Sequence, residues 1–221
     1  SLIRRLSDET DRVSAALLEG RLETRASEDG LEGAYRRMFG GFNRVIATLV
    51  GHLDAMPTPA MIVDPALRIR YLNRAALGLV GKPLGELVGA RCADHLRTGD
   101  CGTDTCACAR AMRDGRPASS ETVARPSAGT FDIAYSGTPI VDGAGQVLGA
   151  LEVIADQTAL KRSARRAERV AEYQARETER VVTALQKLSR GDLTIDVRVA
   201  DGGEDTREVR AVYEAISSAL Q

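Results

Sequence analysis

Residues 57–73, with the sequence PTPAMIVDPALRIRYLN, decide the fold of the centre of the chain. Proline lacks the amide donor and disfavours a helix in the residue before it, so Pro57 and Pro59 end any helix that precedes them. Short apolar runs follow on both sides of the turn formers Asp64 and Pro65. Such a pattern is typical of a β-hairpin, and the segment therefore predicts a change from helices to strands.

The sequence after this hairpin predicts the rest of an α+β domain. Residues 73–90 are expected to form two short helices broken by Gly81-Lys82-Pro83, and residues 110–113 are expected to be helical. Alternating or continuous apolar runs predict three further strands, within residues 121–125, 129–142 and 146–156. Five strands, with the helices inserted between the second and the third, make a domain of about 100 residues, which is a common size.

Amphipathic helices are expected before this domain. Residues that step by three and four define the seam of the first helix: Ile3, Leu6, Thr10, Val13 and Leu17. A second series follows a polar, glycine-containing connector at residues 20–33: Tyr35, Met38, Phe42, Val45, Leu49, Leu53 and Met56. This stepping places each series on one helix face and is typical of a coiled-coil seam.

The order of helix, connector and helix returns after the domain. The seam of the long third helix is Leu160, Ala164, Ala167, Ala171, Gln174, Thr178, Val181, Leu185 and Leu188. Its middle buries little apolar area, so it predicts either two nearly equal packings, which suit signal transmission, or a plain tether. A connector at residues 189–205 leads to a last seam: Val209, Val212, Ile216 and Leu220. This internal repeat is the main feature of the chain's organisation.

Composition excludes several classes of protein. Lys and Arg number 30 against 31 Asp and Glu, and the charges are interspersed, so the chain lacks the basic surface of a nucleic-acid-binding protein. Aromatic residues make up only 4% of the chain, which is typical of helical bundles rather than of large β-rich cores. No GxSxG, Walker or HExxH motif occurs, and no acid–base pair stands out. We therefore expect no enzymatic activity within these residues.

Hydropathy predicts no membrane contact within this segment. No apolar run approaches the ~20 residues that span a bilayer, and the N-terminus has no charged-then-apolar signal pattern. The chain begins with Ser1, and an apolar heptad pattern is already running at Leu2. We expect a segment of a longer protein, in which a membrane anchor elsewhere is allowed.

The cysteines form one candidate site. Cys92, Cys101, Cys106 and Cys108 have the spacing C-x8-C-x4-C-x-C, and His95 lies in the first gap. Sulfur and imidazole are ligands of soft and borderline metals, so the segment allows an iron-sulfur cluster or Zn²⁺. A disulfide or thiol switch without a cofactor and a set of buried structural cysteines are the alternatives. His52, on the second predicted helix, is expected to be an ordinary surface or seam residue.

Short motifs in both flanking repeats resemble HAMP domains of methyl-accepting chemotaxis proteins. Residues 188–194, LSRGDLT, are similar to the end of the first HAMP helix and the start of its connector. Residues 19–23, EGRLE, occupy the matching place in the first copy, and Phe42-Asn43 matches a Phe-Asn pair of the second HAMP helix. The usual acidic-acidic-x-Gly start of the second helix is altered in both copies, to Glu28-Asp29-Gly30 and Glu204-Asp205-Thr206.

The central part resembles a PAS sensor domain. Its opening has the pattern P-x-P-x4-D at residues 57–64, followed by I-x-Y-x-N-x-A at residues 69–75 and L-x-G at residues 87–89. Asp156-Gln157-Thr158 matches the Asp-x-Thr that couples the last PAS strand to an exit helix. The resemblance implies that Asp156 and Thr158 relay the signal. It also implies a five-stranded antiparallel sheet with short helices.

The cysteine segment is similar to that of a PAS subgroup in bacterial sensors, which implies redox or iron-sulfur sensing. Loss of a cluster or formation of a disulfide would then report oxygen or redox state. His95 lies where some haem-binding PAS domains carry an iron ligand, so haem is a further alternative, and flavin is another. A dimeric adaptor without a ligand is the competing class of function.

Together the resemblances imply the order HAMP, PAS, HAMP in the cytoplasmic sensing part of a chemoreceptor. The expected domains are residues 1–53, residues 54–158, and residues 159–221 with a coiled-coil linker and a truncated second HAMP domain. In that family, parallel four-helix bundles form in a parallel homodimer. The signal passes to a downstream signalling domain and through it to a histidine kinase complex, and the receptor itself catalyses no reaction.

Overall fold

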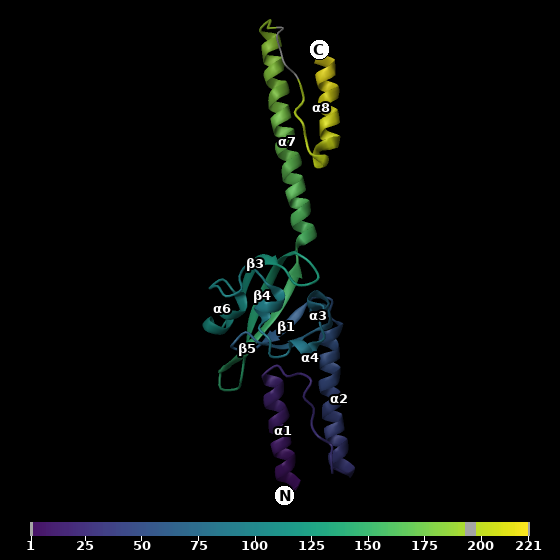
Figure 1. The fold of residues 1–221 in the computed structure, drawn as a ribbon, viewed down its shortest axis with the longest axis vertical. Helices are drawn as coiled ribbons and strands as arrows, with labels where there is room; N and C mark the ends of the chain where they lie inside the picture. The colour runs from purple at the N-terminus through teal and green to yellow at the C-terminus, as the bar shows by residue number, and fades with distance from the viewer. Residues whose placement is uncertain (1, 193–197, 221) are drawn as a thin grey trace. The chain divides into compact units, whose positions relative to one another are not determined.

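The computed structural model describes residues 2–192 and 198–220 (Figure 1). The chain divides into two compact units, Ser1–Gln157 and Thr158–Gln221. Leu193 and Thr194, which belong to the second HAMP-like motif, lie outside the described residues. Within the described part of the chain, no helix is both long and apolar enough to cross a bilayer.

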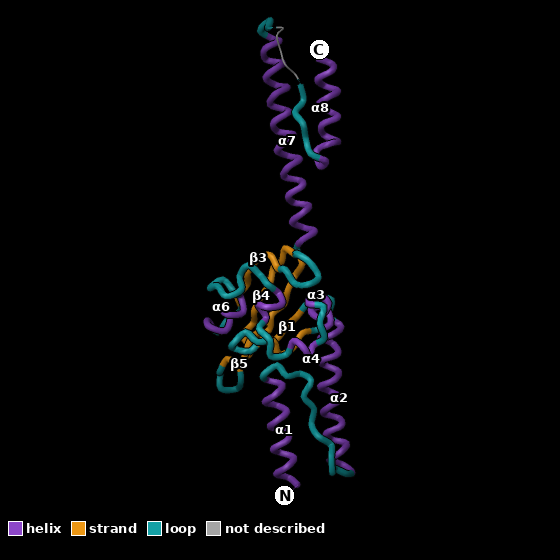
Figure 2. Tube along the Cα trace, in the orientation of Figure 1, coloured by secondary structure: helices purple, strands orange, loops and turns teal. Residues whose placement is uncertain are grey.

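The first unit contains an antiparallel five-stranded sheet, whose strands are orange in Figure 2. The strand order is β2-β1-β5-β4-β3. The strands are β1 (Ala60–Val63), β2 (Ile69–Leu72), β3 (Ala118–Ala124), β4 (Phe131–Val141) and β5 (Val147–Asp156). All five predicted strands and the hairpin at Asp64 are confirmed. The last strand, β5, lies in the middle of the sheet because it pairs with both β1 and β4.

Four short helices connect β2 to β3: α3 (Arg74–Val80), α4 (Leu84–Leu87), α5 (Cys92–Leu96) and α6 (Ala107–Asp114). The side chain of Asn73 accepts a hydrogen bond from the amide of Ala76 and caps α3, as expected for a short polar residue before a helix. The sequence predicted α3, α4 and the second half of α6. It missed α5 and the first turn of α6, because helices this short have no readable periodicity.

The core of the domain lies between the sheet and these helices. Its largest fully buried members include Met61, Leu72 and Leu87, and Cys108 belongs to the same cluster. Helix α6 lies directly on β4, because a Cβ atom at Gly137 would stand 2.8 Å from the Cα atom of Cys108. Glycine at this position therefore lets the cysteine-bearing helix approach the sheet backbone.

Two parallel helices precede the sheet, α1 (Leu2–Leu18) and α2 (Gly33–Ala55), as predicted (Figure 1). A second apolar cluster joins them to their connector: Leu6, Val13, Ala26, Leu31, Phe39 and Ile46. On α2 the face that packs within the chain contains Phe39 and Ile46, whereas several predicted seam residues are exposed: Tyr35, Met38, Val45 and Leu49. Helix α2 thus has a second apolar face that no described residue of the single chain covers.

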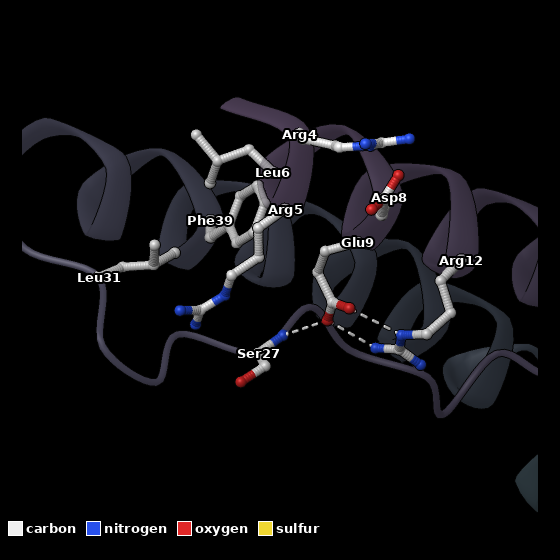
Figure 3. Close-up of a pocket in the computed structure, with 9 residues that line it drawn as sticks. All are labelled: Arg4, Arg5, Leu6, Asp8, Glu9, Arg12, Ser27, Leu31 and Phe39. Atoms are coloured by element: carbon white, nitrogen blue, oxygen red, sulfur yellow. Dashed lines mark hydrogen bonds and ion pairs between the residues drawn. The ribbon is translucent and has the colours of Figure 1, made fainter. Parts of the chain in front are cut away.

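Polar side chains hold the first connector against its helices. Glu9 on α1 accepts hydrogen bonds from the amide of Ser27, at 2.6 Å, and from the guanidinium of Arg12, as the dashed lines in Figure 3 show. Asn43 on α2 both donates to and accepts from the backbone of Ala26, at 2.9 Å in each case. In the Phe42-Asn43 pair, Phe42 thus packs against the apolar cluster, and Asn43 binds the backbone of the connector.

The ends of α1 and α2 both contact the outer face of the β1–β2 hairpin. Gly20, after α1, lies so close to Ile62 that a side chain there would collide with it. Asp54, near the end of α2, accepts a hydrogen bond from the hydroxyl of Tyr71 at 2.7 Å. Ile62 and Tyr71 are neighbours across the β1–β2 pair. The helices before the domain are thereby attached to one pair of strands.

The second unit contains α7 (Thr158–Ser189), the short 3-10 helix η1 (Glu204–Thr206) and α8 (Arg207–Leu220). The buried face of α7 contains Tyr173, Glu177 and Ala184, which the seam prediction did not include. Tyr173 donates a hydrogen bond to the carbonyl of Ala200 in the connector, at 2.9 Å. Predicted seam residues such as Leu160 and Leu185 are exposed.

The two helix–connector–helix segments share a glutamate that makes the same two contacts in each. Residues 9–13 read ETDRV and residues 177–181 read ETERV. In both, the glutamate pairs with the arginine three residues later and accepts a connector amide, that of Ser27 in the first copy and that of Ala200 in the second. The internal repeat predicted from the sequence therefore extends to side-chain roles.

Candidate sensory site

The four cysteines lie on the helices and the turn that cover the sheet. Cys92 begins α5, Cys101 lies in the turn after it, Cys106 is the N-cap residue of α6, and Cys108 lies in the first turn of α6. All four are free thiols, and Cys108 is buried whereas the other three are half-buried. The Sγ atom of Cys101 lies 3.1 Å from the hydroxyl of Thr98. The first three cysteines are thus partly exposed as residues, whereas Cys108 lies in the domain core.

A buried carboxyl group on the sheet faces this segment. Cys108 donates a hydrogen bond from Sγ to Oε2 of Glu152 on β5, at 3.2 Å. Only 4% of Glu152 is exposed, and only 1% of Cys108. Glu152 was not among the predicted site residues, although a single acidic residue inside the apolar run GALEVIA was a usable signal. Burial of such a group requires a partner, and the thiol supplies it.

Burial also sets the protonation of this site. It raises the pKa of Glu152 to about 7, against a smaller lowering by the hydrogen bond from Cys108. Burial, together with the charge of Glu152, raises the pKa of Cys92 to about 12 and raises the pKa values of Cys106 and Cys108 above their usual range. These three thiols are therefore protonated at neutral pH and react slowly as nucleophiles.

The thiols influence one another electrostatically, which places them in one neighbourhood. The pKa of Cys92 is raised in part by Cys101 and Cys106, and the pKa of Cys108 is raised in part by Cys106 and Cys92. Cys92, Cys106 and Cys108 thus lie near one another and near Glu152, and Cys101 lies near Cys92 and Cys106. His95 lies on α5 three residues after Cys92 and is half-buried.

A hydrogen-bond network holds the cysteine loop, residues 97–106 between α5 and α6, against β4. Tyr135 donates from its hydroxyl to Oδ2 of Asp100, and this hydroxyl also accepts a hydrogen bond from the amide of Ala107, the first residue of α6. Burial raises the pKa of Asp100, but hydrogen bonds from Ser120, Tyr135 and Thr105 outweigh it and hold that pKa below its usual value. No sequence pattern indicated this pairing of a loop residue with a strand residue.

The cysteine donors do not form a ready metal centre in the arrangement described. Among the described residues, no three His, Cys, Asp or Glu side chains are placed so that they could hold a metal ion. Sulfur and carboxylate are suitable ligand types for Zn²⁺ or iron, but ligation would require the thiols to lose their protons and to move together. Predictions of an iron-sulfur cluster or Zn²⁺ therefore stay predictions.

One apolar cavity borders the sheet near the end of β5. Its lining includes Leu96 from α5 together with Ile154 and Asp156, and its volume is about 40 Å³. Ligand pockets usually measure ~300–1,000 Å³, so a haem or flavin at this place would require the helices to move outward. The haem and flavin alternatives also stay predictions.

The predicted relay residues lie where the two units meet in the sequence. Asp156 is the last residue of β5, and Thr158 is the first residue of α7. Between them, Gln157 donates its amide to the carbonyl of Asp132 at 2.8 Å, which fixes the end of the sheet to the start of β4. Their role in signal relay is a prediction that the geometry leaves open.

Comparison with known proteins identifies the fold of the central part of the chain. The family profile of the PAS fold matches residues 53–162, which contain all five strands and the cysteine segment. No curated protein sequence matches the chain.

Solved structures of PAS domains resemble about half of the chain at low sequence identity. A PAS domain of a protein from Colwellia psychrerythraea is 20% identical, with a TM-score of 0.46, and the match covers 52% of this chain and 98% of that one. The PAS domain of nitrogen regulation protein NR(II) from Vibrio parahaemolyticus is 17% identical, with a TM-score of 0.41, covering 49% of this chain and 96% of that one.

Proposed function

Because residues 53–162 form a PAS domain, we propose that the chain is the sensing and relaying part of a bacterial chemoreceptor. In this proposal the domain detects redox state, oxygen or a metal ion through Cys92, Cys101, Cys106 and Cys108. The flanking helices act as HAMP units that carry the resulting change onward. The chain itself catalyses no reaction and lies in the cytoplasm.

The observation that carries the proposal is the position of the cysteines relative to the output strand. Cys108 contacts Glu152, and Cys92 and Cys106 lie near it; Glu152 lies on β5, the strand from which the chain continues into α7. A chemical change at the thiols therefore acts on the strand next to the exit from the domain. A ligand shifts a conformational equilibrium only when it interacts differently with the two states, and this contact provides such a difference.

Repetition of the helix pair supports the HAMP assignment. Each copy has two parallel helices, a connector clamped by a glutamate, and apolar residues that remain exposed in the single chain. On α2, Val45 is 58% exposed and Leu49 is 59% exposed. We propose that a second copy of the chain covers these residues in a parallel homodimer of four-helix bundles. The partner downstream would be a signalling domain that controls a histidine kinase complex.

Anaerobic purification tests the proposed sensing. The absorption spectrum, the content of iron and zinc, and the number of free thiols are measured before and after exposure to air or to an oxidant. The proposal expects a bound metal or cluster, or thiols that oxidise reversibly. A colourless, metal-free protein whose four thiols stay reduced in oxidant would contradict it and would favour a dimeric adaptor without a ligand.

A further inference from the structure

Glu152 is a buried residue of the sheet that contacts the cysteine segment directly at Cys108. Its neighbours in the ladder are Met61 on β1 and Gly137 on β4, so it occupies the middle of the central strand. Gly137 is also the position where α6 packs directly onto the sheet. The carboxyl group therefore lies where helix α6, β4 and β5 meet.

The bond between Cys108 and Glu152 depends on the thiol proton. As a thiol, Cys108 donates to Oε2 of Glu152 at 3.2 Å. In a disulfide, or as a metal-bound thiolate, the sulfur has no proton to donate. Glu152 is then a buried acceptor without its donor, and an unsatisfied buried acceptor costs far more than an ordinary hydrogen bond contributes. A shift of the strand that brings the carboxyl group to another donor or to water would relieve that cost.

Strand β5 offers a short path for such a shift. Side chains alternate along a strand, so Glu152, Ile154 and Asp156 project from the same face. Ile154 and Asp156 both line the small cavity that also contains Leu96 of the cysteine-bearing helix α5. Unfilled space beside these residues lets the end of β5 move without a collision.

We propose that Glu152 is a positioning residue: its hydrogen bond with Cys108 makes the conformation of β5 depend on whether the Cys108 sulfur carries a proton. The proposal rests on the proposed function, because it assumes that Cys108 changes its chemical state. The residue that responds to the change at Cys108 is thus a core residue of β5, four positions before Asp156.

Substitutions test the contact without any redox chemistry. Cys108→Ala removes the donor permanently, and we expect amide exchange in residues 147–156 of the full chain to become at least about tenfold faster. The double variant Cys108→Ala/Glu152→Met removes both polar groups and should return exchange to the parent rate, because an apolar pair leaves nothing unsatisfied. Cys101→Ala is the matched control and should leave this strand unchanged.

Oxidation tests whether the response of β5 to a change at Cys108 depends on Glu152. Diamide converts two thiols into one S–S bond, and their two protons and two electrons reduce its N=N bond to a hydrazine. In the parent chain, oxidation that includes Cys108, identified by peptide mapping, should speed exchange in residues 147–156. In Glu152→Met the same disulfide should form while the exchange of the strand stays constant.

The outcomes separate the two proposals. If the thiols oxidise in both proteins and β5 responds equally in both, the role of Glu152 is wrong while cysteine sensing stands. If Cys108→Ala leaves exchange in β5 unchanged, or if the double variant stays as fast as the single one, the contact does not control the strand and the inference is overturned. If neither metal ions nor oxidants alter the thiols of the parent chain, the sensing function fails and the inference fails with it.

Discussion

Tyr135 on β4 donates a hydrogen bond to Asp100 in the cysteine loop, with 2.8 Å between Oη and Oδ2. The same hydroxyl accepts the amide of Ala107 and so completes the N-terminus of α6, whose N-cap residue Cys106 gives no side-chain cap. A strand residue thus does what a local capping residue usually does. The position of Cys106 and Cys108 on the sheet depends on this contact.

Removal of the Tyr135 hydroxyl is expected to loosen the cysteine loop. Tyr135→Phe removes one of the three hydroxyl donors to Asp100 and leaves the first amide of α6 without its acceptor, which should cost ~1–3 kcal/mol of the free energy of unfolding. Thiols held less firmly should also react faster with a thiol reagent. Tyr35→Phe, at an exposed position on α2, is the control. Equal thiol rates and equal stability in the parent and in Tyr135→Phe would show that the network does not seat the loop.

Stability should fall as the pH rises toward neutrality. Burial raises the pKa of Glu152 from 4.5 to about 7, so the folded state binds this proton more tightly than the unfolded chain does. The resulting stabilisation is complete below about pH 4.5 and is lost as the pH rises through about 7, with a total of about 3 kcal/mol at ~1.36 kcal/mol per pKa unit.

Urea unfolding between pH 5 and pH 8 measures this loss. Glu9, whose pKa is lowered to about 2 by its hydrogen bonds with Arg12 and Ser27, is ionised throughout this window and does not contribute to the change. Glu152→Gln has no proton to lose and should give a flatter profile. A parent profile as flat as that of the variant would mean that Glu152 ionises at its ordinary pKa.

The exposed apolar face of α2 predicts association of two chains. Leu49→Lys places a charge on that face and should convert the dimer to a monomer, since burial of an unpaired charge is costly. Ala47→Lys, at an exposed position on another face of the same helix, should leave the dimer intact. Light scattering at tens of micromolar measures both variants. A parent chain that is monomeric under these conditions would refute the dimer.

Asp156 and Thr158 are predicted to couple the sheet to α7. In Asp156→Ala and Thr158→Ala the cysteines should bind or oxidise as in the parent, whereas receptor output should become locked or insensitive. If both residues only cap a helix, each substitution costs ~1 kcal/mol of stability and output still follows the cysteine state. Output measured together with thiol state distinguishes these cases.

The sequence predicted the order of elements well because local chemistry determines it. Pro57, Pro59 and the turn at Asp64 mark the change to strands, and Gly81 and Gly115 end helices in the left-handed conformation that favours glycine. These signals require only neighbouring residues.

Contacts between distant residues were the part that the sequence did not reveal. The pairs Tyr135–Asp100 and Cys108–Glu152 join positions far apart in the chain, and only the fold brings them together. The heptad patterns placed helices correctly, but they did not show which of two apolar faces of α2 packs within the chain. The cysteines were found from their spacing, whereas the group they contact was not.

Amide exchange in α7 tests most directly whether the cysteine state leaves the domain. Exchange in residues 158–189 is measured in the full chain with the thiols reduced and after their oxidation or loading with a metal ion. A variant with all four cysteines changed to serine is treated in the same way. The account predicts that exchange in α7 changes with cysteine state in the parent and stays constant in the serine variant. Thiols that react fully in the parent while exchange in α7 remains the same in both states would contradict it.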